Sequence, residues 1–236
     1  MSFRMILAMD ILDGKVVHAR RGEREKYKPI HLFSSIVEDS APLHVLEKLN
    51  PREVYIADLD RLLKRGDNKE VIKEMKKRNR EVEIMLDYGI ESERDLREVI
   101  DAADNIILGT ETASLELIRR ASASESNISV SVDLFSRKVV TKDKKMKIDP
   151  YLLIKELNNY RLKDIIVLEL DRVGMKRGVD FSFLSRIVEI SNHNILCGGG
   201  VRSCEDIYKM EEIGVKGAIV ATAIYDESIP ISLLRR

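Results

Sequence analysis

The sequence predicts an α/β fold, a (β/α)₈ TIM barrel built from two (βα)₄ half-barrel repeats. Three observations lead to this prediction: short β-branched runs, charged helical stretches between most of them, and an internal repeat. The 236 residues are 44% apolar with 12 Gly and two Cys, so a full core can form without metal or disulfide bonds. We predict one domain over residues 1–236, with half-barrels of about 1–123 and 124–236.

The strands are predicted from short runs that are rich in β-branched residues and are bounded by turn residues. In chain order these runs are Met5–Met9, Val54–Ala57, Val82–Leu86, Asn105–Leu108, Ile128–Val132, Asp164–Leu168, Asn194–Cys197 and Gly217–Val220. Runs of this length fit the strands of a parallel sheet with helical connections.

Helices are predicted where apolar residues recur at helical spacing beside charged faces. These stretches are Asn68–Arg80, Ser92–Ala102, Ala113–Ala121, Pro150–Tyr160, Phe181–Ser191 and Ser203–Ile213. Ser92 and Ser203 are predicted N-caps, with Asp95 and Asp206 three residues later as capping-box partners. Such alternation fits a (β/α)₈ barrel, with an open doubly wound sheet as the alternative.

An internal repeat favours the closed barrel over the open sheet. The matches occur in the same order in both halves of the chain. They pair Asp10-x₄-Lys15-Val16-Val17 with Asp133-x₄-Lys138-Val139-Val140, Leu59-Asp60-Arg61 with Leu170-Asp171-Arg172, Gly89-Ile90-x-Ser92-x₂-Asp95 with Gly200-Val201-x-Ser203-x₂-Asp206, and Ile107-x₂-Thr110 with Ile219-x₂-Thr222. A half-barrel alone would leave exposed strand edges, so two halves are expected to close into one barrel.

The charge balance argues against nucleic acid and membrane partners. Lys and Arg number 40, as do Asp and Glu, so no global field attracts nucleic acid or an anionic membrane. No apolar run approaches the ~18 residues of a spanning helix, and residues 1–10 lack the long apolar region of a signal peptide. The two cysteines, Cys197 and Cys204, agree with a reducing compartment, so we expect a cytoplasmic protein. The oligomeric state stays open.

Two aspartates form the predicted catalytic pair. Asp10 ends the first strand and Asp133 ends the fifth, and the C-terminal ends of the strands are where barrels carry their chemistry. The two carboxylates therefore face each other across the mouth. If the surroundings of one carboxyl group raise its pKa, that group can act as an acid, while the other carboxylate stays ionised and acts as a base. Such a pair suits proton transfer. The alternative is that each Asp only caps its own loop.

A phosphate site is predicted after the seventh and eighth strands. Gly198, Gly199 and Gly200 follow the seventh strand, and Ala221 and Thr222 follow the eighth. Glycines let a ligand oxygen approach backbone N–H groups, and these two loops are the usual phosphate site in barrels. A tight turn without a ligand is the alternative. We therefore expect a small phosphorylated metabolite as the partner.

The matched place in the first half has a different chemistry. It reads Asp87-Tyr88-Gly89, with Glu111 after the fourth strand. Carboxylates there would repel a phosphate, and Tyr88 would add bulk. The sequence thus predicts that phosphate binds the second half, while the first half receives a neutral, hydroxylated or cationic group. The alternative is that these side chains point away and a phosphate still fits.

The other acidic and histidine side chains give weaker signals. Four acids end strands two and six, namely Asp58, Asp60, Glu169 and Asp171. No His joins them at metal-ligand spacing, so salt bridges to Arg61 and Arg172 are favoured, no metal site is predicted, and a metal-assisted lyase is the alternative. Of the histidines, only His18 and His31 are expected to reach the mouth, from the long first loop.

The assembled pattern resembles the half-barrel family of histidine biosynthesis. This family includes phosphoribosylformimino-5-aminoimidazole carboxamide ribotide (ProFAR) isomerase and the cyclase subunit of imidazole glycerol phosphate synthase. The resemblance covers essentially the whole chain, and the residues that carry it are Met9–Val17, Val132-Asp133-x₄-Lys138-Val139, Gly198–Val201 with Ser203, and Ala218–Ala223. The first-strand Asp resembles the isomerase more than the cyclase.

This resemblance implies an Amadori rearrangement of an aminoaldose to an aminoketose. By similarity to the isomerase, Asp133 would be the general acid that protonates the furanose ring oxygen as the ring opens to a Schiff base. Asp10 would be the general base that takes the proton from C2. The resemblance implies that no cofactor is required.

The sequence departs from the isomerase pattern at three places. Leu168 stands where the isomerase has a catalytic Thr, and His18 stands where an Arg usually follows Lys-Val-Val. Asp87 and Tyr88 stand in a first phosphate site that is glycine-rich in the isomerase. We therefore expect a paralogue with an altered substrate, and we include Asp87 and His18 among the candidate substrate-binding residues. The alternatives are the isomerase itself and a barrel that binds a phosphorylated metabolite without turnover.

Overall fold

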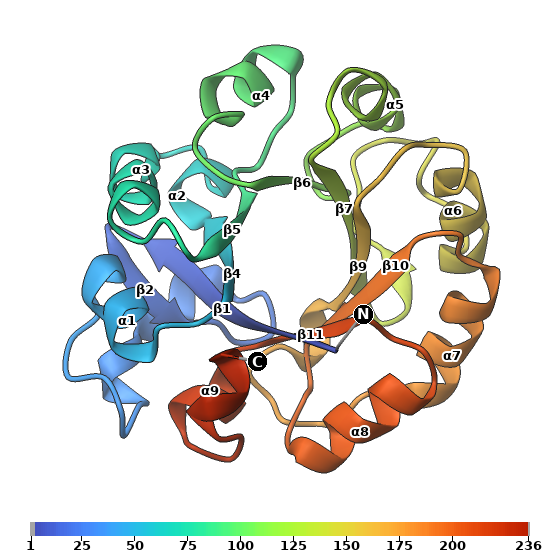
Figure 1. Cartoon of the computed structure of the whole chain (residues 1–236). Helices are drawn as coiled ribbons and strands as arrows, with labels where there is room; N and C mark the ends of the chain where they lie inside the picture. Colours follow the sequence, from blue (N-terminus) through green and yellow to red (C-terminus); the bar gives the residue numbers. More distant parts are fainter. Residues whose placement is uncertain (1–2, 236) are drawn as a thin grey trace.

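Parallel strands close into a barrel in the computed structural model, which describes residues 3–235 (Figure 1). Each strand hydrogen-bonds to the next, and the last pairs with the first, with Arg4 opposite Gly217. The barrel strands are β1 (Arg4–Leu12), β4 (Glu53–Asp58), β5 (Glu83–Asp87), β6 (Asn105–Gly109), β7 (Ile128–Phe135), β9 (Asp164–Glu169), β10 (Asn194–Gly198) and β11 (Gly217–Val220). The predicted (β/α)₈ barrel is confirmed, and the open sheet is excluded.

Helices surround the barrel and cover its outer face (Figure 1). They are α1 (Pro42–Leu49), α3 (Lys69–Arg78), α4 (Glu93–Val99), α5 (Leu115–Ser124), α6 (Pro150–Leu157), α7 (Phe181–Ile190) and α8 (Cys204–Glu212), with short helices α2 (Leu59–Leu62) and α9 (Thr222–Tyr225). Ser92 and Ser203 cap α4 and α8 as predicted, because each hydroxyl accepts the N–H of the Asp three residues later. No helix within residues 3–235 has the length and apolar character needed to span a membrane.

Helix α1 was not predicted from the sequence. It begins with Pro42 in its first turn and ends at Asn50, whose φ of 43° is left-handed. Both residues are ordinary boundary signals of a helix, since Pro suits the first turn and Asn tolerates the left-handed cap. Its buried residues Pro42, Val45, Leu46 and Leu49 also follow the i, i+3, i+4, i+7 spacing of a helix, so the signal was present in the sequence.

The repeated Asp-x₄-Lys-Val motif forms a hairpin at the end of two barrel strands. In the first half, β2 (Lys15–His18) pairs antiparallel with β1, and in the second, β8 (Lys138–Val139) pairs with β7. Each turn holds two residues at positive φ, Asp13-Gly14 and Ser136-Arg137, as tight two-residue hairpin turns require. The two hairpins therefore place Asp10 and Asp133 at equivalent points of the two halves.

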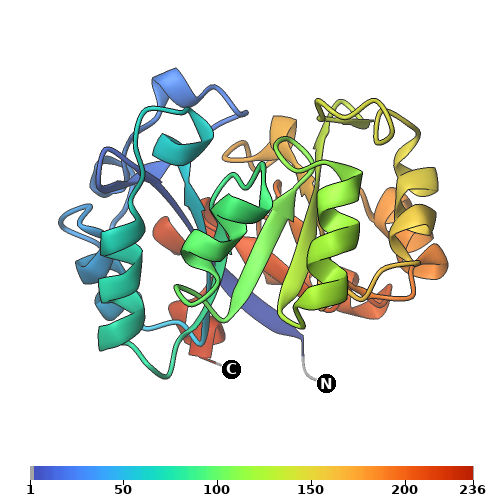
Figure 2. The ribbon, with the colours of Figure 1, turned by 90° about the horizontal axis from the view of Figure 1, so that it is seen from above.

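Alternation along each strand separates the barrel interior from the layer beneath the helices. On β1, Ile6 joins the interior cluster and Leu7 the outer one. Arg4 shares the interior face at the start of the strand, where it contacts Glu53 and Asp164. The described chain begins and ends at that end of the barrel (Figure 2). By the same alternation, Asp10 faces the interior at the opposite end.

The remaining elements of the described chain are one short strand, β3 (Lys28–Pro29), and four 3₁₀ turns. The turns are η1 (Arg24–Lys26), η2 (Ile30–Leu32), η3 (Leu170–Arg172) and η4 (Ile231–Arg235). Turn η1 and β3 belong to the long first loop, which crosses the C-terminal end of the barrel.

Candidate functional site

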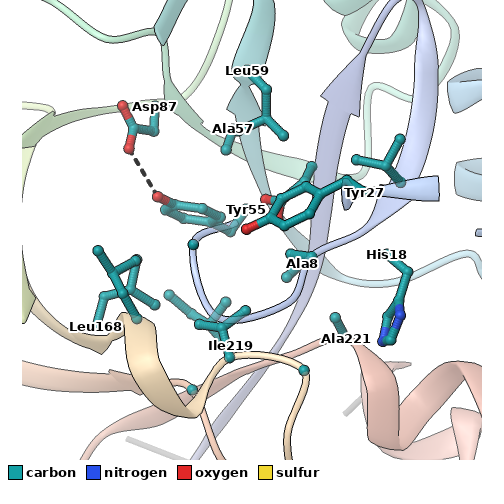
Figure 3. Close-up of a pocket in the computed structure, with 18 of the residues that line it drawn as sticks. Ala8, His18, Tyr27, Tyr55, Ala57, Leu59, Asp87, Leu168, Ile219 and Ala221 are labelled. Carbon is teal, nitrogen blue, oxygen red and sulfur yellow. Dashed lines mark hydrogen bonds between the residues drawn. The ribbon is translucent and has the colours of Figure 1, made fainter. Parts of the chain in front are cut away.

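A pocket opens at the C-terminal end of the barrel (Figure 3), and its lining includes the two predicted catalytic residues. Asp10 from β1 and Asp133 from β7 both line it, together with Asp87 from β5. Strands β1 and β7 are separated by three strands along the sheet, so the two predicted carboxylates reach the pocket from different sides. The barrel therefore brings together residues that are 123 positions apart in the sequence.

Asp133 is buried and held by several donors. The Ser131 hydroxyl donates to Oδ1 at 2.6 Å, and the Glu111 N–H donates to Oδ2 at 3.2 Å. Thr110 accepts the Asp133 N–H at 3.0 Å and donates its hydroxyl to Oδ2 at 3.4 Å. Burial and the nearby Asp87 raise the pKa of Asp133 to about 7, against the lowering effect of these donors.

Asp10 is half-buried and has a simpler environment. Its carboxylate makes no side-chain hydrogen bond with any residue in the range 3–235. Burial raises its pKa to about 7, the Arg24 guanidinium acts in the opposite direction, and Asp87 adds to the rise. Asp10 is therefore available to exchange a proton with a ligand near neutral pH.

Asp87 is the third carboxylate of the pocket, and Figure 3 shows the Tyr55 hydroxyl directed at it. That hydroxyl donates to Oδ2 at 3.0 Å, and the Gly89 N–H donates to Oδ1 at 3.1 Å. Burial raises the pKa of Asp87 to about 6. A side chain on Gly109 would place its Cβ 3.2 Å from Asp133 Oδ2 and 3.5 Å from Asp87 Oδ2, so the two carboxylates pack closely against this glycine.

Asp87 and Tyr88 point in opposite directions, as neighbours at a strand end do. Asp87 enters the pocket, so the alternative that it points away is wrong. The Tyr88 ring is fully buried in the outer layer, 5.2 Å from the Arg61 guanidinium carbon. The expectation that Tyr88 adds bulk to the mouth is therefore wrong.

The glycine loop of the second half lines the pocket only in part. Gly199 and Gly200 contribute to the wall with φ of 92° and 85°, and a Cβ on Gly199 would meet the Glu169 carbonyl oxygen at 2.6 Å. Gly198 is not among the described lining residues. A Cβ there would lie 2.7 Å from Leu168 Cδ1, so close packing against that side chain explains this glycine.

Ala221 and Thr222 line the same side of the pocket, next to His18. The His18 Nε2 lies 3.1 Å from the Thr222 hydroxyl, and its ring stacks on Phe33 at 4.5 Å between centroids. Burial lowers the pKa of His18, so the neutral imidazole is favoured. The structure thus places His18, but not His31, at the pocket, because the His31 ring hydrogen-bonds to Ser40 instead.

The first loop covers the pocket through contacts that the sequence did not reveal. Arg24 donates twice to the Glu111 carboxylate, at 2.8 and 2.6 Å, and Tyr27 joins the lining (Figure 3). The loop also donates the Arg21 N–H to the Val173 carbonyl at 3.0 Å. No local motif marks these residues, because their partners are distant in the chain.

The acidic residues of β4 stabilise loops. Asp58 caps α2 and accepts the side-chain and backbone N–H groups of Asn68 at 2.7 and 2.6 Å. Because its oxygens are occupied, Arg61 pairs with Asp95 of α4, and the expected bridge to Asp58 or Asp60 is wrong. The expected bridge of Arg172 is found with Glu169, at 2.7 Å. Within residues 3–235, no three ligating side chains are grouped around a possible metal position.

Replacing Asp10 by Asn is expected to stabilise the protein above neutral pH. The folded-state pKa of about 7 exceeds the ordinary 3.8, so the ionised carboxylate is disfavoured by folding. This penalty is absent below about pH 4, grows as pH rises, and is complete above about pH 7. Denaturation at pH 8 should give Asp10→Asn an advantage of roughly 2 to 4 kcal/mol over the wild type, which vanishes near pH 4.

The exposed Asp101 provides the control for this comparison. Asp101→Asn should change the free energy of unfolding by less than about 0.5 kcal/mol at either pH. A gain in Asp10→Asn that stays constant between pH 4 and pH 8 would contradict the burial argument.

Comparisons with known proteins show the family of this chain. The family model described as "Histidine biosynthesis protein" matches residues 4–230. The chain is 30% identical to an uncharacterized protein of Methanocaldococcus jannaschii, with 94% of this chain and 93% of that protein covered.

Two further relatives share one printed name, 1-(5-phosphoribosyl)-5-((5-phosphoribosylamino)methylideneamino)imidazole-4-carboxamide isomerase. The protein of Halothermothrix orenii is 29% identical, and 98% of each chain is covered. The protein of Prochlorococcus marinus strain NATL1A is 31% identical, with 96% of this chain and 90% of that protein covered. With a family model that spans nearly the whole chain and relatives that match end to end, the protein belongs to the histidine biosynthesis protein family.

Proposed function

We propose that this protein is an isomerase-type enzyme that acts on a phosphorylated, sugar-type metabolite through Asp10 and Asp133. The observation that carries the proposal is the pair itself: two carboxyl groups from β1 and β7, in one pocket, each with its pKa raised to about 7. A pair that titrates near neutral pH can hold one proton and accept another. Such a pair suits acid–base chemistry on a bound sugar.

The two environments favour different roles for the two carboxyl groups. Asp133, buried and fixed by Ser131 and Glu111, is oriented to donate a proton to the ring oxygen of an aminoaldose. The C1–O bond then breaks and C1 forms a Schiff base with the amine. Asp10 removes the proton from C2, the electron pair forms a C1–C2 double bond, and the protonated nitrogen becomes neutral. Return of a proton to C1, with loss of the C2 hydroxyl proton as the C2 carbonyl forms, gives the aminoketose.

Three features support a paralogue with a different substrate. Leu168 presents a hydrocarbon side chain to the pocket where the isomerase pattern has a hydroxyl, and Asp87 presents a carboxylate in place of a glycine-rich phosphate site. In addition, M. jannaschii carries both the uncharacterized relative, at 30% identity, and a protein that bears the isomerase name, at 26%. One organism thus has two members of this family that resemble the present chain.

Growth of a histidine auxotroph that lacks the isomerase distinguishes the paralogue from the isomerase itself. We expect this gene to give no growth without histidine, because Asp87 stands where a second phosphate would bind. The H. orenii isomerase gene provides the positive control. Full growth with this gene would establish the histidine-pathway activity and overturn the altered substrate.

Acid–base turnover is tested separately from the pathway. Ribose 5-phosphate and ammonia form an aminoaldose phosphate in solution, and NMR in D₂O follows exchange of its C2 hydrogen. The enzyme should accelerate this exchange if Asp10 removes the C2 proton. The absence of exchange, together with tight binding of a phosphorylated sugar, would favour the barrel that binds without turnover.

A further inference from the structure

We propose that Asp87 makes the site selective for ligands that carry one phosphate and present a protonated amine at the opposite end. This inference deepens the proposed function and rests on it for the location of the phosphate in the second half. It assigns to Asp87 a specificity role, distinct from the proton transfer of Asp10 and Asp133.

The loops after β5 and β10 differ in backbone conformation at one matched position, Tyr88 in the first half and Gly199 in the second. Residues 87–89 match residues 198–200 at a constant offset in the repeat. Gly199 has a φ of 92°, and a Cβ there would collide with the Glu169 carbonyl. Its counterpart Tyr88 lies outside the left-handed region and buries its ring under the helices. The first-half loop therefore follows a different path past the pocket.

The amide groups of the first half already have acceptors from the protein itself. Gly89 donates its N–H to Asp87 Oδ1 at 3.1 Å, and Glu111 donates its N–H to Asp133 Oδ2 at 3.2 Å. At the position matched to Gly89 in the second half, the N–H of Gly200 has no backbone acceptor within residues 3–235, and Gly200 lines the pocket. Carboxylates thus occupy the first-half donors, while the Gly200 N–H remains available to an anion.

The charge on this side of the pocket also disfavours a phosphate. Four acidic side chains line the pocket as a whole, namely Asp10, Asp87 and Glu111 from the first half and Asp133 from β7. Both terminal nitrogens of Arg24 donate to Glu111, and the same guanidinium, from a greater distance, acts against the rise in pKa that burial causes in Asp10 and Asp87. A phosphate group near four carboxylates and one guanidinium would be repelled in this partly desolvated space, whereas a cation would be attracted.

Asp87 and Asp133 come together beside Gly109, and all three residues line the pocket. Asp87 Oδ2 and Asp133 Oδ2 lie 3.5 and 3.2 Å from the point where a Gly109 Cβ would stand, so the two carboxylates are neighbours in the pocket wall. An ammonium group that enters the pocket at this wall is within reach of both carboxylates. Tyr55 positions Asp87 by donating its hydroxyl to the same carboxylate at 3.0 Å. The strongest interaction available there is a hydrogen bond from a charged nitrogen donor.

Three five-carbon probes that differ only at C1 test the inference by titration calorimetry on the full chain. They are ribulose 5-phosphate with a hydroxyl, 1-amino-1-deoxyribulose 5-phosphate with an ammonium, and ribulose 1,5-bisphosphate with a second phosphate. We expect the amine to bind about tenfold or more tightly than the hydroxyl compound, since a hydrogen bond to a charged group is worth at least that factor. The bisphosphate should bind most weakly.

Asp87→Asn keeps the shape of the side chain and removes its charge. In this variant the ratio of amine to hydroxyl affinity should fall severalfold, because the charge of Asp87 is lost while that of Asp133 remains. Glu91→Gln is the matched control, since Glu91 lies on the same loop but outside the pocket lining and binds Lys64 and Lys142. That control should keep the wild-type ratio.

The outcomes separate the inference from the proposed function. The role of Asp87 would be overturned if the bisphosphate bound as tightly as the amine or more tightly. It would also be overturned if the ratio of amine to hydroxyl affinity were unchanged in Asp87→Asn. Failure of every phosphorylated probe to bind would overturn both proposals. Preferred binding of the amine without C2 hydrogen exchange would support the role of Asp87 and overturn only the isomerase function.

Discussion

Asp133→Asn should slow C2 hydrogen exchange by about 10²- to 10⁴-fold, the usual contribution of a general acid or base. The amide keeps the size of the side chain, so the contacts with Ser131 and Glu111 can be preserved in part. It cannot supply the proton that the ring oxygen needs. Binding of ribulose 5-phosphate should change by less than about threefold, because an uncharged sugar hydroxyl interacts weakly with either group.

Asp10→Asn should have an effect of similar size for a different reason. Its amide cannot accept the C2 proton, although the ring can still open. The double variant should be little slower than the slower single variant, because residues that act in one sequence are not additive. Thermal denaturation of each variant shows whether it is folded. Exchange at wild-type rates in both Asn variants would remove the pair from the mechanism.

Arg4→Ala should lower the free energy of unfolding by about 3 to 5 kcal/mol, the typical effect of removing one partner of a buried ion pair. Arg4 closes the N-terminal end of the barrel interior, where it donates to Glu53 at 2.7 Å and to Asp164 at 2.8 Å. The Asp164 side chain is fully buried. Removing the guanidinium would leave two carboxylates in the interior without their cation. Urea denaturation measures the loss.

An exposed arginine gives the comparison for this stability prediction. Arg94 pairs with Glu98 on α4, but 84% of its side chain is exposed. Arg94→Ala should therefore lower stability by less than about 1 kcal/mol. Equal effects of the two substitutions would contradict a structural role for the ion pairs of Arg4. Ligand binding should be retained in folded Arg4→Ala, because the pocket lies at the other end of the barrel.

Much of the fold was predictable because its signals are local. Strands such as Ile128–Val132 have β-branched runs, and the caps at Ser92 and Ser203 depend on residues three positions apart. The repeat then excluded the open sheet. Helix α1 has the same kind of local signal, since Pro42, Val45, Leu46 and Leu49 follow helical spacing, but it was missed because it is only 8 residues long.

Prediction of the site was less complete because its contacts are long-range. The repeat placed Asp10, Asp133, Gly199 and Thr222 at strand ends, and all four line the pocket. No spacing in the sequence relates Arg24 to Glu111, since these residues are 87 positions apart and meet only when the first loop crosses the barrel.

The sequence by itself determined the barrel, its two halves and the strand ends at which the aspartates lie. Periodicity and repetition carry that information, because the first depends on neighbouring residues and the second appears when the two halves of the sequence are compared. Only the tertiary structure decided that Asp87 enters the pocket while Tyr88 leaves it, and that Gly198 serves packing against Leu168. The physical reason is that the direction of a side chain at a strand end depends on the closed sheet and on what already fills each face.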